Sequence, residues 1–200
     1  MNDEIGVGPH TQPWPVGEQY DETLLAEGDR RNVIDQYRYW TVEAIKRDLA
    51  KNANDFEIAI ENWQHDFNIG TIVRNANAFN ARRVHIIGRR HWNKRGAMVT
   101  DAYLTVVHHQ SVEDFVEYAR GMHIIAIDNV TGSKNLSAVR LPANAVFVFG
   151  GEGPGLSSEM ITASEQMIKI EQYGSTRSVN VGVASGIVMY QWARDHKQVD

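Results

Sequence analysis

Residues 168–194, IKIEQYGSTRSVNVGVASGIVMYQWAR, decide the fold that the sequence predicts. The stretch begins as a short apolar strand that ends at Ile170. It continues as a polar loop over residues 171–178 and becomes a helix from about Val179, with apolar residues about one turn apart. In an α/β protein, such a strand–loop–helix unit places a ligand at the carboxyl end of the strand. A simpler interpretation gives the loop no chemistry and makes Ser178 the N-cap of the helix.

The rest of the chain alternates between predicted strands and helices. Strands are predicted at residues 56–60, 84–87, 105–108, 123–127 and 145–149, helices at residues 68–80, 112–119 and 157–163, and a loop at residues 131–142. This alternation is typical of an α/β protein, in which helices cover both faces of a parallel sheet. The predicted fold class is therefore α/β and Rossmann-like, with one domain over residues 56–200.

Residues 1–55 form a predicted N-terminal extension outside that domain. Residues 1–31 combine several glycines and prolines with little apolar content, which predicts an extended or partly disordered, flexible arm. Residues 32–52 have apolar residues at helical spacing and are predicted to form an amphipathic helix. The net charge of −5 lies entirely in this extension, which holds 11 acidic and 6 basic residues, whereas residues 56–200 hold 14 of each.

Composition excludes several kinds of site. No cysteine is present, so the chain has no disulfide, no thiolate nucleophile and no cysteine-ligated zinc. The spacings that a histidine metal site, a calcium loop or a serine hydrolase requires are missing, and we expect no metal. The sequence has no apolar run long enough to cross a membrane and no secretion signal, so we predict a cytoplasmic protein.

A cluster of basic residues predicts contact with nucleic acid. Six cations fall within residues 82–95, a segment that contains no acid and that we call the basic segment. They are Arg82, Arg83, Arg89, Arg90, Lys94 and Arg95. A local basic patch can bind a polyanion even when the total charge is negative. The alternative is a solvated loop without a partner.

Residues 150–156, GGEGPGL, directly follow a predicted buried strand. Glycine lets the backbone approach a ligand closely and adopt conformations that are barred to other residues. The motif is not a P-loop, because no Gly-Lys-Ser/Thr follows, and Glu152 would repel the pyrophosphate of a dinucleotide. It therefore favours a ligand that is neutral or cationic at this point. The alternative is a tight turn between strand and helix.

Asn68 and Arg74 mark a second candidate site, at the start of a predicted helix. Asn68 is placed to cap that helix, and Arg74 follows within two helical turns, so both side chains can face the same edge of a cleft. Arginine is well suited to bind a phosphate. The alternative is a surface arginine paired with Glu61 or Asp66.

Three blocks of sequence, taken in order, resemble the SpoU (TrmH) family of RNA ribose 2′-O-methyltransferases, within the SPOUT class. The blocks are N-x-G-x-x-x-R from Asn68 to Arg74, FGGEGPGL over residues 149–156, and I-x-x-x-G-S-x-x-S-V-N-V-x-V-A from Ile170 to Ala184. The resemblance covers residues 56–194. It departs mildly at Val179, where leucine is usual, and at Asn75, where threonine is usual.

The resemblance implies a fold, a cofactor and a partner. A deep trefoil knot is expected at the C-terminal end, with S-adenosylmethionine bound in it mainly through backbone groups. A homodimer is expected, with the site near its interface. By position, the cofactor-binding residues are Gly150, Gly151, Ile170, Ser178 and Val179.

The resemblance also implies a reaction, the methylation of a ribose 2′-hydroxyl in tRNA or rRNA, with guanosine as the expected nucleotide. Arg74 is the expected key catalytic residue. It engages the substrate phosphate and hydroxyl, and a phosphate oxygen helps to take the proton, because arginine stays protonated. Asn68 and Ser178 are expected to position Arg74 and the ribose, and Glu152 and Asn180 to hold the motif loops. The RNA is expected to reach the site over the basic segment.

Two other functions stay open at this stage. A SPOUT relative could methylate a base, such as N1 of guanosine, although the block from Asn68 to Arg74 favours ribose methylation. A non-catalytic RNA-binding protein could retain the knot, although Arg74, Glu152 and Asn180 are all intact. A nucleotide-binding dehydrogenase is disfavoured by the glycine spacing.

Overall fold

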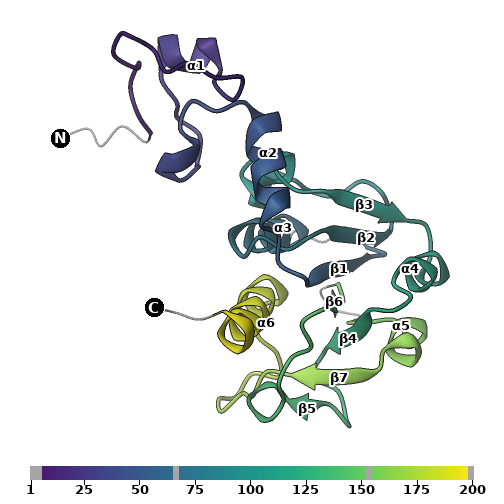
Figure 1. Ribbon diagram of the computed structural model, residues 1–200. Helices are drawn as coiled ribbons and strands as arrows, with labels where there is room; N and C mark the ends of the chain where they lie inside the picture. The colour runs from purple at the N-terminus through teal and green to yellow at the C-terminus, as the bar shows by residue number, and fades with distance from the viewer. Residues whose placement is uncertain (1–5, 65–67, 152–154, 198–200) are drawn as a thin grey trace. The chain divides into compact units, whose positions relative to one another are not determined.

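The computed structural model describes residues 6–64, 68–151 and 155–197 (Figure 1). The chain divides into two compact units, residues 1–52 and 53–200. The smaller unit contains the helices α1 (Glu22–Glu27) and α2 (Val42–Lys51). The larger unit contains the sheet.

A buried carboxylate organises the smaller unit. Asp29 is fully buried and accepts hydrogen bonds from Arg31 Nε at 2.9 Å and Arg31 Nη2 at 2.7 Å. Tyr39 N also donates to this carboxylate, at 3.0 Å. Burial alone would raise the pKa of Asp29, but these hydrogen bonds lower it to about 2. Asp29 and α1 both lie in the stretch that the sequence predicts as an arm.

The helix predicted for residues 32–52 is shorter than expected. α2 spans Val42–Lys51, and a separate 3-10 helix, η1 (Asp35–Tyr37), precedes it. Tyr39 has a left-handed backbone with φ of 63°, which a continuous right-handed helix does not permit. Thr41 then caps α2 with its side-chain oxygen. The apolar spacing that predicted one helix therefore runs through two helical pieces and a break.

A seven-stranded sheet organises the larger unit, in the order β3-β2-β1-β6-β4-β7-β5. Every neighbouring pair is parallel, which confirms the predicted sheet. The strands are β1 (Glu57–Asn62), β2 (Val84–Gly88), β3 (Val106–His109), β4 (His123–Ile127), β5 (Lys134–Asn135), β6 (Ala145–Phe149) and β7 (Gln166–Lys169). β5 lies in the segment predicted as a loop.

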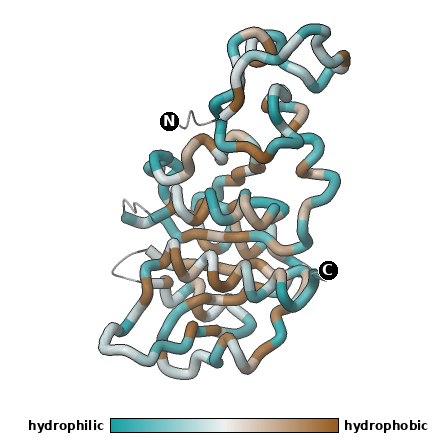
Figure 2. The backbone as a smooth tube through the Cα atoms, turned by 90° about the vertical axis from the view of Figure 1, so that its left-hand side faces the viewer, coloured by the Kyte–Doolittle hydropathy of each residue, from teal (hydrophilic) through white to brown (hydrophobic). Residues whose placement is uncertain are grey.

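The central strands are apolar because both faces of the sheet are covered. β1 and β6 are buried at every residue, as expected for the middle of a parallel sheet. Figure 2 shows brown, hydrophobic stretches of backbone through the middle of the larger unit. In Figure 1, α3 (Ile69–Ala78) and α6 (Val181–His196) lie on one side of the sheet, and α4 (Val112–Tyr118) and α5 (Ser158–Ala163) lie on the other.

Each face of the sheet has its own core. On one face, Ile58 of β1 belongs to a buried cluster with Ile72 of α3 and Val188 of α6. On the other, Ala59 of β1 belongs to a cluster with Phe115 of α4 and residues of α5. Adjacent residues of β1 enter different clusters because successive side chains of a strand point to opposite faces. The helices packed on the two faces thus hold the ends of the strands in place, and with them the start of each loop.

Membrane-spanning helices and metal sites were both sought among the described residues. None of their helices has the length and apolar character needed to cross a bilayer. None of their histidine, aspartate and glutamate side chains forms a group of three or more that could hold a metal ion. The trefoil knot stays a prediction from the resemblance.

Candidate active site

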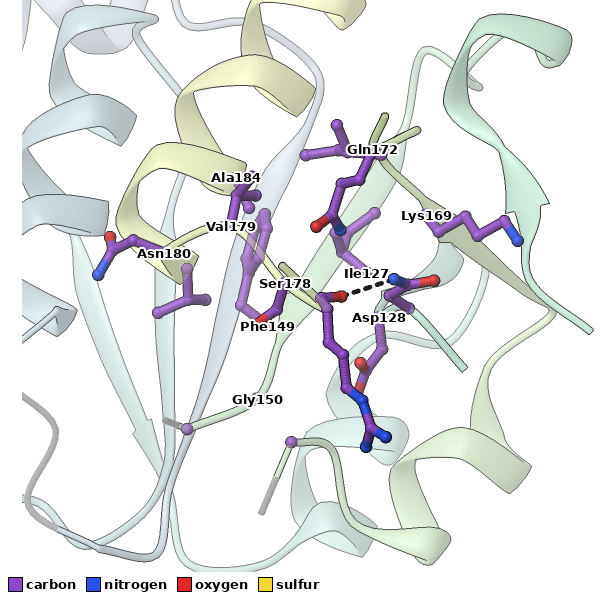
Figure 3. A pocket seen from close by; sticks show the side chains of 16 residues that line it. Ile127, Asp128, Phe149, Gly150, Lys169, Gln172, Ser178, Val179, Asn180 and Ala184 are labelled. Carbon is purple, nitrogen blue, oxygen red and sulfur yellow. Dashed lines mark hydrogen bonds between the residues drawn. The ribbon is translucent and has the colours of Figure 1, made fainter. Parts of the chain in front are cut away.

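A cavity of about 560 Å³ opens at the carboxyl ends of β4, β6 and β7, beside the start of α6 (Figure 3). It is lined by residues 127–129 at the end of β4, residues 149–151 and 155 at the end of β6 and in the loop after it, residues 169, 170, 172 and 177–180 at the end of β7 and in the loop after it, and Val181 and Ala184 of α6. β6, β4 and β7 are neighbours in the sheet. Three segments far apart in sequence therefore converge on one edge of the sheet, the edge at which α/β proteins bind ligands.

The residues predicted to contact a cofactor come together at this cavity. Its lining includes Gly150, Gly151, Ile170, Ser178 and Val179. Asn180 lines it as well, whereas Glu152 lies outside the described residues. Arg177, whose direction the sequence left open, also lines the cavity, while Tyr173 is 96% exposed.

Gly150 and Gly155 let two parts of the backbone after β6 approach closely. A Cβ atom at Gly150 would lie 2.2 Å from the carbonyl carbon of Gly155, and Gly155 has φ of +68°. Gly155 N donates a hydrogen bond to Gly151 O at 3.2 Å. Leu156 N donates to Asp128 Oδ2 at 3.2 Å. Residues 155 and 156 are thereby held against the end of β4, and Gly150, Gly151 and Gly155 form part of the cavity wall.

α6 begins two residues later than predicted, and Asn180 rather than Ser178 is its N-cap. Asn180 Oδ1 accepts hydrogen bonds from Gly182 N at 2.9 Å and Val183 N at 3.3 Å. Asn180 Nδ2 donates to Asn68 Oδ1 at 2.8 Å. The interpretation of Ser178 as a helix cap is therefore wrong, and Ser178 is an exposed residue of the cavity lining.

Asn68 connects α3 to α6 instead of capping α3. It occupies the N-cap position, but its side chain makes no capping hydrogen bond. Asn75 makes a second connection, because its Nδ2 donates to Gly182 O at 2.8 Å and to Ser185 Oγ at 3.0 Å. A Cβ atom at Gly182 would lie 2.8 Å from Thr71 Cγ2. α3 and α6 can therefore approach closely at this point because residue 182 is a glycine. The first and third sequence blocks therefore form one surface beside the cavity.

Arg74 is exposed on α3. Its side chain has no hydrogen bond or ion pair with any residue that the structure describes. Glu61, a partner considered from the sequence, is buried and accepts hydrogen bonds from Ser157 Oγ at 2.7 Å and Trp63 Nε1 at 2.9 Å. Asp66, the other candidate, lies outside the described residues. Pairing with Glu61 is therefore wrong.

The fold divides the basic segment into paired and unpaired cations. The ion pairs are Arg82 with Asp55 at 2.5 Å, Arg83 with Glu57 at 3.0 Å and Lys94 with Asp101 at 2.8 Å. Arg89, Arg90 and Arg95 are exposed and form no ion pair within residues 6–64, 68–151 and 155–197. The acids come from outside the segment, which is why it looks uniformly basic in the sequence.

Asn62, which the sequence did not single out, tethers the basic segment. It is buried at the carboxyl end of β1, and its Nδ2 donates to Arg89 O at 2.7 Å and His91 O at 3.1 Å. The start of α3 packs beside the same segment, because a Cβ atom at Gly70 would lie 2.8 Å from Ala97 N in the 3-10 helix η2 (Arg95–Ala97). The available sequence signal was a polar residue ending an apolar strand.

Comparisons with known proteins agree with this geometry. The model of the SpoU rRNA Methylase family matches residues 55–190. The tRNA (guanosine(18)-2′-O)-methyltransferase of Escherichia coli is 24% identical over 154 residues, which are 74% of this chain and 67% of that protein. The structure of the TrmH/SpoU tRNA modifying enzyme of Aquifex aeolicus is 25% identical, with a TM-score of 0.68 over 78% of this chain and 82% of that one.

A third similar protein was solved with a cofactor. The SpoU methyltransferase AviRb from Streptomyces viridochromogenes, in complex with AdoMet, has a TM-score of 0.61 and 24% identity. The match covers 70% of this chain and 60% of that protein's chain. At this level of identity the likeness shows a shared fold.

Proposed function

The chain belongs to the SpoU rRNA Methylase family, and we propose that it is an S-adenosylmethionine-dependent methyltransferase acting on a ribose 2′-hydroxyl, at a guanosine of tRNA or rRNA. The observation that carries this proposal is the hydrogen bond of 2.8 Å between Asn180 and Asn68. It brings the block that ends in Arg74 to the wall of the cavity. We assign the activity to residues 56–200, with residues 1–55 as an extension. RNA substrates fit the cytoplasmic location expected from the sequence.

The cavity suits S-adenosylmethionine in size and chemistry. Its volume of about 560 Å³ lies within the usual range for small-molecule sites. Ile127, Ile170 and Val179 provide apolar surface for a flat ring. Asp128 provides a negative charge for the sulfonium or ammonium group, and Lys169 and Arg177 provide positive charge for the carboxylate. When bound, S-adenosylmethionine supplies an electrophilic methyl group on a positively charged sulfur. Gly150 lacks the Cβ that would collide with the backbone of Gly155, so both residues can line the cavity.

The protein's own groups then bind and orient the RNA. Arg74 is available to hold a substrate phosphate next to the 2′-hydroxyl, and positioning of this kind supplies much of the rate in transfer reactions. Among the described lining residues there is no histidine to accept the hydroxyl proton. Arg74 stays protonated and is not the base, so a phosphate oxygen that Arg74 holds in place helps to take the proton, which then passes to water. Asn68 and Ser178 help to place the ribose.

Transfer of a tritiated methyl group from S-adenosylmethionine to total tRNA and rRNA tests the function. We expect labelled RNA whose nucleoside digest contains a 2′-O-methylated ribose, with the label mapped by mass spectrometry. A methyl group on a base nitrogen would instead make the protein a base methyltransferase. RNA binding without any binding of S-adenosylmethionine would make it a non-catalytic RNA-binding protein.

We propose that RNA reaches Arg74 over the unpaired part of the basic segment. Gly70 packs against η2 at the end of this segment, and Arg74 lies one helical turn further along the same face of α3. This packing supports a path for the RNA over Arg95, which begins η2, and over Arg89 and Arg90 earlier in the same segment. Asn62 fixes the start of this surface through its two bonds to backbone carbonyls.

Charge reversal of Arg89 and Arg90 to glutamate should weaken RNA binding by at least about tenfold. Loss of two phosphate contacts should lower the slope of log Kd against log salt by about two. Cofactor affinity, measured by calorimetry, should not change. Arg120→Glu is the matched control, because Arg120 is exposed at the end of α4. RNA affinity equal to that of the wild type would remove the basic segment from the binding site.

We further propose a homodimer that uses an exposed apolar stripe on α6. Val183, Ile187 and Tyr190 are 54%, 37% and 59% exposed and recur at helical spacing. We expect a dimer in sedimentation experiments and a monomer for Ile187→Glu. Val106→Glu, at a position with the same exposure of 37% on β3, should remain dimeric. A monomeric wild type, or a dimeric Ile187→Glu variant, would contradict this assignment.

A further inference from the structure

Gln172 presents an unsatisfied acceptor to the cavity. It follows β7 and lines the cavity, and its side chain is directed into it in Figure 3. Its Oε1 is buried and has no hydrogen-bond partner among the residues that the structure describes. Buried amide oxygens are nearly always paired, because an unpaired one loses its bonds to water without replacement. The missing donor is therefore expected to come from a ligand.

Gln172 differs in its location from the other residues that have a buried side-chain atom without a hydrogen-bond partner. The others in the described residues are Arg38 Nε, Asn54 Oδ1, Asn62 Oδ1 and Asn77 Oδ1. None of these residues lines the cavity. The unpaired oxygen of Gln172 is thus the one whose partner a bound small molecule can supply.

The surroundings of Gln172 indicate the kind of donor. The cavity lining includes the apolar side chains of Ile127, Ile170 and Val179, which suit a flat heteroaromatic ring. A cationic ammonium is better matched by Asp128, the carboxylate among the described lining residues. A neutral N–H group at the edge of a ring fits an amide acceptor in an apolar wall. Adenine carries such a group, its exocyclic amine.

We propose that Gln172 Oε1 accepts a hydrogen bond from the exocyclic amine of adenine and so selects an adenosyl cofactor. This inference rests on the proposed function, because it concerns the same cavity. A 6-oxopurine carries a carbonyl oxygen where adenine carries the amine. In the amide orientation that the structure shows, that oxygen would face Oε1 without a proton between them, so this orientation disfavours an inosyl ligand. Gln172 is therefore a specificity-determining residue.

Calorimetry with two ligands tests this assignment. S-adenosylhomocysteine and S-inosylhomocysteine differ at the 6-position of the purine and in the proton that N1 carries in the 6-oxo form, so it is the effect of Gln172→Met that assigns the preference to Gln172. We expect the wild type to prefer the adenosyl ligand by at least about tenfold, the scale of one buried hydrogen bond. Gln172→Met keeps the length of the side chain and removes the acceptor. Its preference should fall to within about threefold, mainly through weaker binding of the adenosyl ligand.

Two further variants make the result specific. Gln172→Glu retains an acceptor at the same position and should keep the preference for the adenosyl ligand. Gln166→Met is the matched control on β7, because Gln166 does not line the cavity. A full preference in Gln172→Met, or no preference in the wild type, would overturn the inference. A wild type that binds neither ligand would overturn the proposed function itself, and the inference with it.

Discussion

Replacing Arg74 with alanine should lower the single-turnover rate of methyl transfer by at least about 10²-fold, with cofactor affinity unchanged. The expected loss is that of one positioned group that orients the reacting atoms and stabilises developing charge. Arg74 is exposed and makes no ion pair or hydrogen bond with the described residues. Its removal should therefore alter the free energy of unfolding by less than about 0.5 kcal/mol. Lost activity could then not be attributed to unfolding.

The measurement needs saturating RNA, so that weaker substrate binding is separated from slower transfer. Arg74→Lys keeps the positive charge but loses the planar fork that binds a phosphate through two hydrogen bonds, so we expect it to recover only part of the rate. Arg120→Ala, at an exposed arginine on another face, should retain full activity. Near-normal turnover of Arg74→Ala with unchanged cofactor affinity would show that Arg74 does not have the proposed role.

The sheet was predictable from the sequence because its signals are local. β4 and β6 have the bounds that their apolar runs predicted, residues 123–127 and 145–149. Such runs arise when helices cover both faces of a parallel sheet. The break before α2 was not predictable in this way. It depends on the left-handed backbone of Tyr39, and the apolar spacing of the segment carries no mark of it.

The candidate site was predictable in its motifs but not in its contacts. Serine and asparagine are about equally good N-caps, so local preference cannot choose between Ser178 and Asn180. In the fold, Asn180 also bonds to Asn68, a residue 112 positions away. The same limit applies to the basic segment, whose cations meet acids that precede or follow it in the chain. Gln172 likewise has no sequence signal, because its significance lies in an unpaired buried atom.

Replacing His85 with leucine should lower the free energy of unfolding by about 2–4 kcal/mol, because two buried polar side chains would each lose a hydrogen-bond partner. Glu57, His85 and His109, on β1, β2 and β3, form a buried chain of hydrogen bonds. His85 Nε2 bonds to Glu57 Oε2 at 2.7 Å, and His85 Nδ1 bonds to His109 Nε2 at 2.9 Å. Leucine would leave both neighbours short of a partner, although Glu57 keeps its ion pair with Arg83.

Urea denaturation at pH 7 measures this effect. His123→Leu is the matched control, because His123 is exposed on β4 and its ion pair with Glu165 is at the surface. Surface pairs contribute about 0–1 kcal/mol, so the control should unfold almost as the wild type does. Equal losses in the two variants would show that the buried chain of Glu57, His85 and His109 does not stabilise the sheet.

The same chain predicts how stability depends on pH. Burial and the neighbouring His85 hold the pKa of His109 below its ordinary value of 6.5. Burial alone would raise the pKa of Glu57, but hydrogen bonds from His85 and Arg83 hold it below 4.5. In both cases the unfolded chain takes up protons first as the pH falls, so protons favour unfolding.

The free energy of unfolding should therefore decrease as the pH falls from 6.5, with His109 acting first and Glu57 adding its effect below 4.5. His109→Gln cannot take up the proton, so its stability should fall less steeply between these two pH values. Parallel pH profiles for the wild type and His109→Gln would mean that other groups cause the decrease. A wild-type profile that is flat between pH 6.5 and 4.5 would mean that His109 does not have a lowered pKa in the folded protein, and a profile that stays flat below 4.5 would mean the same for Glu57.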